Sequence, residues 1–221
     1  MLRPYHSSFR LNVIFMINSE PNKGFILKRI HYLVSLFLIV CFIHTSVSAE
    51  EETHVKCLSQ ACFSLSKRSS QGEELSIVGG SRYRFWGFSV YTVALYLKKE
   101  GKPKEWWNEA LAFELYYHRS LKASDFTKTA RKLMAENPAY GEQVSSDVFQ
   151  EFASYIASVS EGDRYTLLYS PDGTLELLFN GTSRGKVIDK SFAQAYIGMW
   201  LGEYAVKESN RDQILAGKFE G

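Results

Sequence analysis

The sequence predicts an α+β fold in which one antiparallel sheet carries helices. Strand-like segments come first, two amphipathic helices follow, and a β-hairpin pattern and further helices complete the chain. Runs of aromatic and β-branched residues are typical of strands, and apolar residues spaced three or four apart are typical of helices. Because strands and helices are grouped and do not alternate regularly, an antiparallel sheet is favoured over a parallel one.

The first 49 residues are typical of a signal peptide. Lys28 and Arg29 precede an apolar run over residues 32–43, and small residues follow at 46–49. This order matches the basic, apolar and cleavage regions of a secretory leader. The apolar run is short for a bilayer span, so we expect no stable membrane span once the leader is removed. We therefore expect cleavage after Ala49 and a periplasmic or secreted protein.

Removal of residues 1–49 leaves 172 residues, enough for one domain with its own core. The leader holds five of the 26 basic residues and one of the 24 acidic ones, so the remaining chain carries a net charge of −2. This balance gives no electrostatic footprint for nucleic acid, and we expect no such partner. Met16 opens a leader of more usual length, which indicates an over-extended start. The oligomeric state stays open.

Residues 50–73 form a polar, serine-rich segment whose short apolar pieces predict one or two weak strands. Cys57 and Cys62 lie in this segment. Export would place them in an oxidising compartment, where a short-loop disulfide can form. The alternative is a pair of small buried residues on an early hairpin. A CxxxxC pair without neighbouring histidines is a poor zinc site, and we expect no metal and no other cofactor.

Strands dominate the start and the later part of the main domain, which we place at residues 74–221. In chain order, the predicted strands cover residues 74–78, 85–98, 112–118, 165–169, 174–179 and 186–188. We expect Gly79 and Gly80 to form a turn after the first strand. Gly87 marks a bulge or a close approach within the second. Residues 170–173, Ser-Pro-Asp-Gly, predict a hairpin between two later strands.

Helices are predicted from apolar stripes and capping residues. Ser124 is expected to cap the first long helix, which ends before Pro138, and Ser145 or Ser146 to cap the second. Their apolar stripes are expected to form core. Three further helices are predicted over residues 104–110, 190–201 and 209–215.

The candidate binding residues follow the expected Gly79-Gly80 turn. This turn would deliver Arg82 and Arg84 to the start of the longest strand, and Tyr91 lies inside that strand. A cation and a phenol that enter one apolar sheet can hold an acidic headgroup. The alternative is that both arginines are solvated strand residues and that Tyr91 belongs to the core, since tyrosine is commonly part-buried.

The motifs of common enzyme classes are absent from the sequence. It has no G-x-S-x-G, P-loop, H-E-x-x-H or dinucleotide-binding pattern. Glu114 lies on a predicted strand and can pair with an arginine, but no second acid converges on it in the sequence pattern. Acid–base chemistry is therefore weakly supported.

Several motifs along residues 74–217 carry a resemblance to a known family, and their order along the chain agrees with it. They are Gly80-Ser81-Arg82 ahead of residues 90–97, residues 130–134, Asp172-Gly173 and residues 197–206. In these motifs the chain resembles the chalcone isomerase-like superfamily, and most of all its bacterial exported branch. The resemblance implies an open-faced β-sandwich, with helices layered on one face of a large antiparallel sheet and a cleft between sheet and helices.

The resemblance also implies a role for the candidate residues. Arg82 matches the arginine that polarises the substrate in plant chalcone isomerases, and Arg84 is the alternative because the loop to the next strand is shorter here. Tyr91 stands where the true isomerases carry a threonine and fatty-acid-binding members carry a tyrosine.

Three further positions depart from the true isomerases. Thr129, Glu136 and Met199 replace a tyrosine, an asparagine and a threonine that hold and polarise a flavonoid. Because catalysis needs donors placed where charge develops, the resemblance implies a non-catalytic protein that binds a small amphipathic carboxylate such as a fatty acid. The alternatives are an intramolecular lyase of the chalcone–flavanone isomerase type and a structural or partner-binding envelope protein.

Overall fold

A computed structural model of the chain describes residues 55–138, 140–142 and 146–220. The chain divides into two units, Met1–Glu51 and Glu52–Gly221, and every element named below belongs to the second. The predicted signal peptide, residues 1–49, lies outside the described residues. No helix within the described ranges is long and apolar enough to cross a bilayer.

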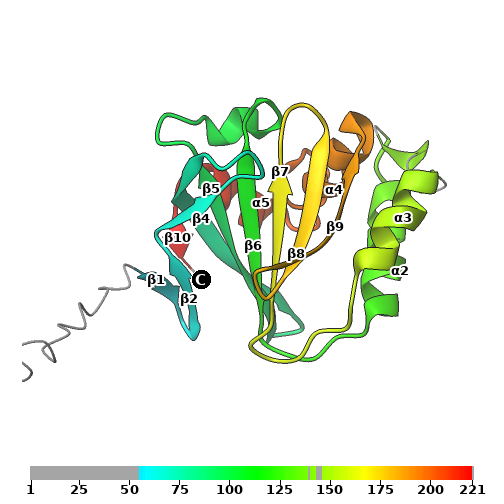
Figure 1. The fold of residues 1–221 in the computed structure, drawn as a ribbon. Helices are drawn as coiled ribbons and strands as arrows, with labels where there is room; N and C mark the ends of the chain where they lie inside the picture. Colours follow the sequence, from blue (N-terminus) through cyan, green and yellow to red (C-terminus); the bar gives the residue numbers. More distant parts are fainter. Residues whose placement is uncertain (1–54, 139, 143–145, 221) are drawn as a thin grey trace, which may run out of the picture. The chain divides into compact units, whose positions relative to one another are not determined.

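A curled, eight-stranded sheet forms the centre of the domain (Figure 1). Its strands are β3 (Ser66–Arg68), β4 (Glu74–Phe85), β5 (Phe88–Leu97), β6 (Leu111–Tyr117), β7 (Arg164–Tyr169), β8 (Thr174–Phe179), β9 (Thr182–Ile188) and β10 (Phe219–Glu220). The strand order is β10-β4-β5-β6-β7-β8-β9, and β3 also pairs with β4. All these pairs are antiparallel except β10 with β4, which is parallel.

The strand β4 continues through the position where the sequence analysis expected a turn, so the predicted turn at Gly79 and Gly80 is wrong. A Cβ atom at Gly79 would collide with the backbone of Ile214, and one at Gly80 would collide with the ring of Phe219. Glycine in a strand often marks such a close approach of another chain segment. These two glycines therefore let the C-terminal part of the domain pack directly against β4.

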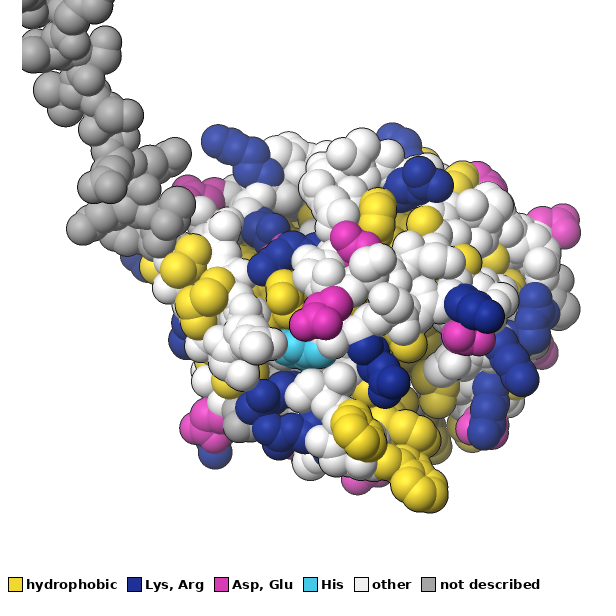
Figure 2. Space-filling view, turned by 90° about the horizontal axis from the view of Figure 1, so that it is seen from below, with side chains coloured by type: hydrophobic (Ala, Val, Ile, Leu, Met, Phe, Trp, Pro, Cys, Tyr) yellow, Lys and Arg dark blue, Asp and Glu magenta, His cyan; other side chains and the backbone are white. Residues whose placement is uncertain are grey.

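The turn that leads into β5 consists of Trp86 and Gly87. Both residues have positive φ, 51° and 82°, and Phe85 pairs with Phe88 across them. Positive φ at both central residues is typical of a tight two-residue hairpin turn. The predicted strand over residues 85–98 is therefore shortened at its start, because Gly87 belongs to a turn. Figure 2, which views the molecule from below, shows hydrophobic side chains projecting at one edge of this end of the domain.

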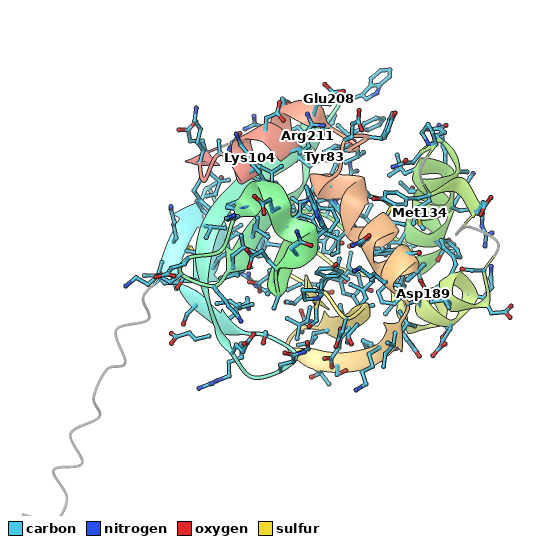
Figure 3. All side chains as sticks on the ribbon, turned by 90° about the horizontal axis from the view of Figure 1, so that it is seen from above. Tyr83, Lys104, Met134, Asp189, Glu208 and Arg211 are labelled. Atoms are coloured by element: carbon cyan, nitrogen blue, oxygen red, sulfur yellow. A yellow bond between two sulfur atoms is a disulfide. The ribbon has the colours of Figure 1, made fainter. Side chains whose placement is uncertain are left out.

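Helices cover one face of the sheet, which confirms the predicted open-faced β-sandwich. They are the 3₁₀ helix η1 (Pro103–Asn108) and the α-helices α2 (Ala123–Ala135), α3 (Asp147–Tyr155), α4 (Lys190–Leu201) and α5 (Glu208–Leu215). In the view from above, α4 lies between α5 and the α2–α3 pair (Figure 3). The main core fills the space between these helices and the sheet, with Leu95, Phe113 and Phe192 fully buried.

The helix caps agree with the sequence in part. Ser146 caps α3 by accepting a hydrogen bond from the Phe149 backbone N–H at 3.1 Å. Ser124, however, lies inside α2 and does not cap it. The backbone N–H of Ala123 instead donates to the Ser158 hydroxyl at 3.1 Å. The cap of α2 therefore comes from a distant loop, which a local pattern cannot reveal.

A smaller core lies on the opposite face of the sheet, beneath the hairpin of β1 (Val55–Leu58) and β2 (Ala61–Ser64). One or two weak strands were predicted over residues 50–73, and the structure has three there: the two strands of this hairpin and β3. Cys57 and Cys62 are direct partners in its register and form a disulfide. Both cysteines are exposed. The predicted disulfide is therefore confirmed, and the alternative of two buried cysteines is wrong.

A buried carboxylate connects this second face to the hairpin. Glu114 of β6 is 4% exposed. Its carboxylate lies 3.1 Å from Lys67 Nζ and 3.3 Å from Arg164 Nη1, and it accepts a hydrogen bond from the Tyr96 hydroxyl at 3.3 Å. Arg164 also donates to the Cys62 carbonyl at 2.7 Å. The predicted pairing of Glu114 with an arginine is therefore confirmed, and the network joins four strands of the sheet to the hairpin.

Removal of the disulfide is expected to lower the free energy of unfolding. The bridge joins residues five positions apart, and the chain-entropy account assigns about 2 kcal/mol to so short a loop. The double variant Cys57→Ser/Cys62→Ser should therefore unfold at lower urea than the oxidised wild type. Reductant should shift the wild type toward the variant and leave the variant unchanged. Identical midpoints for all samples would contradict this expectation.

Glu114→Gln should destabilise the domain by roughly 1.5–3 kcal/mol, the scale of a hydrogen bond to a charged group, because two cations lose their shared carboxylate. The matched control is Glu176→Gln, since Glu176 lies on β8 and forms no ion pair among the described residues. Urea denaturation of both variants measures the difference. Equal stability of the two variants would show that the network contributes nothing.

Candidate functional site

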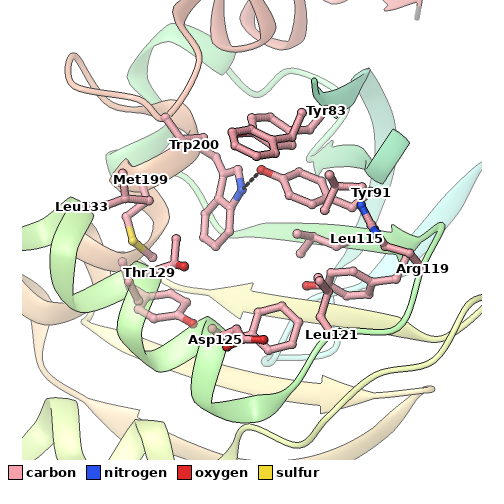
Figure 4. A pocket seen from close by; sticks show the side chains of 17 residues that line it. Tyr83, Tyr91, Leu115, Arg119, Leu121, Asp125, Thr129, Leu133, Met199 and Trp200 are labelled. Carbon is pink, nitrogen blue, oxygen red and sulfur yellow. Dashed lines mark hydrogen bonds between the residues drawn. The ribbon is translucent and has the colours of Figure 1, made fainter. Parts of the chain in front are cut away.

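An apolar cavity of about 360 Å³ lies between the sheet and the helices (Figure 4). Residues of β4, β5 and β6 form its sheet wall, and residues of α2 and α4 form its helical wall. Its lining includes the charged or hydroxyl-bearing side chains Arg119, Asp125 and Thr129 and several tyrosines, and the rest is aliphatic or aromatic. A mostly apolar concavity with a few polar groups is typical of a small-molecule site.

Tyr91 lies in the wall of this cavity, as the sequence analysis proposed for a binding residue. Side chains alternate along a strand, so Tyr91 shares the helix-facing side of β5 with Val93 and Leu95. Its ring stacks on that of Tyr83 at a centroid distance of 4.8 Å. Its hydroxyl accepts a hydrogen bond from Trp200 Nε1 at 3.2 Å. Packing and this hydrogen bond together fix the position of the phenol.

The Tyr91 hydroxyl remains a donor toward the cavity. Burial raises its pKa well above the ordinary value, so the phenol is neutral at physiological pH. The oxygen is an acceptor for Trp200, which leaves the proton to be donated. Among the described residues, no hydrogen bond uses that proton. Burial also raises the pKa of Tyr117 and Tyr196, two further phenols in the cavity wall.

Arg119 supplies the cation at the cavity. The backbone N–H of His118 donates to the Val90 carbonyl at 3.0 Å, which extends the pairing of β6 with β5 by one residue. The next side chain, that of Arg119, therefore returns to the cavity side, where it lies beside Tyr91 (Figure 4). Arg119 is exposed, and its guanidinium forms no ion pair or hydrogen bond within the part of the chain that the structure describes.

Arg82 and Arg84 do not line this cavity. Both belong to β4, where Arg82 pairs with Thr92 and Tyr83 pairs with Tyr91. Because Tyr83 and Tyr91 face the cavity, the neighbouring pair faces the opposite side of the sheet. The structure thus brings Tyr91 to the cavity without either arginine. The physical reason is that β4 has no turn at residues 79–80: the strand continues past an irregularity between Ile77 and Gly79, and its alternation is regular from Gly79 to Tyr83.

The surroundings of Arg82 confirm this placement. Its Nε atom is buried and has no hydrogen-bond partner among the described residues. Nearby, the Thr92 hydroxyl and His118 Nε2 lie 2.7 Å apart. Burial lowers the pKa of His118, and the charge of Arg82 lowers it further. This polar group belongs to the second face of the sheet.

Sequence reasoning did not single out Arg119. The available signal was the alternation of the predicted strand over residues 112–118, whose inner face carries Leu115 and Tyr117. Every second residue of a strand shares a face, so the same pattern continued two residues beyond Tyr117 leads to residue 119. A solvated arginine after a strand is common, so the pattern alone did not distinguish it.

Of the three positions that depart from the true isomerases, two line the cavity and one does not. Thr129 and Met199 line the cavity, whereas Glu136 follows the last residue of α2 and its carboxylate lies 3.8 Å from Lys132 Nζ. Of the described residues that line the cavity, Asp125 alone carries a carboxylate. No cluster of histidine, cysteine, aspartate and glutamate within the described ranges could hold a metal ion.

A second and larger cavity, about 580 Å³, lies on the opposite face. Lys67, Glu114 and Arg164 contribute to its wall. These charges already bind one another, so they offer little to a ligand. The cavity between sheet and helices is the stronger candidate, because the Arg119 guanidinium and the Tyr91 hydroxyl proton have no partner there among the described residues.

Comparison with known proteins agrees with this architecture. The sequence profile of the chalcone isomerase-like family matches residues 65–216. A similar solved structure is the fatty-acid binding protein AtFAP1 of Arabidopsis thaliana, with a TM-score of 0.50 and 14% identity over 68% of this chain and 95% of that one. At this identity the likeness shows the fold alone. No curated protein sequence matches significantly. Because the family profile spans well over half of its length, the chain belongs to the chalcone isomerase-like family.

Proposed function

We propose that this protein is a non-catalytic binding protein that holds a small amphipathic carboxylate, such as a fatty acid. The observation that carries the proposal is that Arg119 and Tyr91 both line one apolar cavity, with Arg119 beside the ring of Tyr91 (Figure 4). A carboxylate there would accept hydrogen bonds from the guanidinium and from the phenol. Charge-assisted bonds of this kind are stronger than neutral ones.

The remainder of the cavity suits an apolar tail. Leu115 of β6 and Leu133 of α2 face it from opposite walls, and Met199 of α4 adds a flexible side chain. Flexible thioether side chains adapt to irregular apolar shapes. An amphipathic ligand would therefore keep its charge near Arg119 and bury its tail between sheet and helices.

This proposal assigns the headgroup to Arg119 in place of Arg82 or Arg84. Neither of those two side chains lines the cavity. The shared fold with AtFAP1, a fatty-acid binding protein by name, supports a lipid-like ligand without identifying it.

We further propose that the protein works outside the cytoplasm, as a member of the exported bacterial branch. Two features support a periplasmic or secreted location. One is the leader-like sequence of residues 1–49. The other is the Cys57–Cys62 disulfide, a bond that persists in oxidising compartments.

Arg119→Ala should weaken the binding of palmitate about tenfold or more, because a hydrogen bond to a charged group contributes roughly 1.5–3 kcal/mol. Tyr91→Phe should weaken it less, since it removes a neutral donor. Arg82→Ala is the matched control: it removes a cation from the opposite face and should leave affinity unchanged. Isothermal titration calorimetry of the three variants and the wild type measures these affinities, with thermal unfolding as a check of folding.

The opposite pattern, with Arg82→Ala impaired and Arg119→Ala unaffected, would place the headgroup on the second face. Absence of palmitate binding in the wild type would favour a structural or partner-binding envelope protein.

Chalcone isomerisation should be absent. Thr129 and Met199 stand in the cavity where the true isomerases have groups that hold and polarise the substrate. The loss of chalcone absorbance in the presence of protein should therefore match that with heat-denatured protein. Turnover on the order of 1–10³ per second, the range of ordinary enzymes, would overturn the non-catalytic assignment.

A further inference from the structure

The tip of the β4–β5 hairpin exposes three large aromatic side chains. Phe85, Trp86 and Phe88 are 57%, 85% and 69% exposed. The hairpin points downward in Figure 1, and the view from below shows hydrophobic side chains projecting at one edge of that end of the molecule (Figure 2). Grouped exposed hydrophobic residues of this kind mark interaction sites more often than single ones do.

Folding alone does not account for Trp86. Its φ of 51° lies in the left-handed region, which is unfavourable for a bulky residue. Asparagine or glycine is the usual residue at this position of such a turn. Because the indole is almost fully exposed, burial does not compensate for the strained backbone. An external partner that contacts the indole would explain why tryptophan stands there.

The hairpin tip lies at the ligand cavity. Phe85 lines the cavity, together with Tyr83 from the same strand and Val90 from β5. Arg119 lines the same end, and Arg84, next to Phe85, is exposed. Two arginines therefore flank an exposed aromatic cluster that leads into an apolar cavity. Asp125 on α2 adds one negative charge to the cavity lining.

The small size of the tip favours a bilayer over a protein partner. Three aromatic side chains contribute about 150–250 Å² each, which together is less than the roughly 800 Å² that each partner buries in a standard specific interface. A lipid interface has no such minimum, and tryptophan is enriched at the level of lipid headgroups. Arginines beside such a group attract anionic headgroups.

We propose that the β4–β5 hairpin tip docks this protein on bilayers that contain anionic lipid. Phe85, Trp86 and Phe88 enter the interface, and Arg84 and Arg119 face the headgroups. The cavity then opens toward the lipid, so an amphipathic carboxylate can pass between bilayer and cavity. Docking stands on the hairpin alone, and the transfer of a ligand rests on the proposed function.

Vesicle cosedimentation tests the docking. The probe is a vesicle of phosphatidylcholine and phosphatidylglycerol, and the full chain is used for every variant so that the N-terminal residues are common to all. Trp86→Asn removes the indole and supplies a residue that the turn favours. It should bind at least about tenfold more weakly, because the apolar area of one indole leaves the interface. Phe88→Thr, a second variant that suits a strand, should also bind more weakly.

Ile188→Asn is the matched control. Ile188 is 70% exposed and ends β9, at the opposite end of the sheet from the hairpin. Its binding should equal that of the wild type. Higher salt, or vesicles of phosphatidylcholine alone, should weaken binding by the wild type. Equal binding by wild type, Trp86→Asn and Phe88→Thr would overturn the proposal, as would an absence of wild-type binding.

Two further measurements separate docking from its alternatives. Calorimetry with palmitate in the absence of vesicles should give the same affinity for Trp86→Asn as for the wild type, because Trp86 does not line the cavity. If vesicles bind and palmitate does not, docking stands and the ligand proposal fails. Sedimentation velocity should show no dimer that depends on Trp86. Such a dimer, without vesicle binding, would replace the bilayer with a second copy of the chain.

Discussion

The alternation of side chains along β5 is the constraint on which the rest of the molecule depends. Tyr91, Val93 and Leu95 face the helices, whereas Ala94 and Tyr96 face the β1–β2 hairpin. Each strand beside β5 keeps the same division, because paired residues share a face. A shift of one residue in this register would exchange the side chains of the helix-facing cavity with those of the Glu114 network. The two faces are therefore chemically distinct because one register is maintained.

The two faces of the sheet are stabilised by different interactions. The helix-facing side excludes water with large apolar layers and holds a mostly apolar cavity with a few polar groups in its wall. The other side is covered by a short hairpin that could not bury much area alone. There, Glu114 binds two cations and a phenol at once, and a disulfide closes the hairpin. A small module can stay in place when covalent and ionic contacts supplement a limited core.

The sequence revealed the fold class and the long helices, because periodicity is a local property. It failed where a residue serves a distant partner. Gly79 and Gly80 indicated a turn, but their cause is contact with Ile214 and Phe219 at the far end of the domain. Arg82, which was expected to act with Tyr91 at one headgroup, lies on the other face of the sheet. Arg119 was missed for the converse reason: its position at the cavity depends on one extra backbone bond beyond β6.

The pairing along the outer edge of β4 bears on the order in which parts of the domain fold. β3 covers one stretch of that edge and β10 another, and β10 pairs at Gly80 and Ser81 from the opposite end of the domain. Contacts so far apart in the sequence form late, since a large loop must close first. During synthesis the central stretch of β4 therefore stays open, and an open strand edge invites other strands.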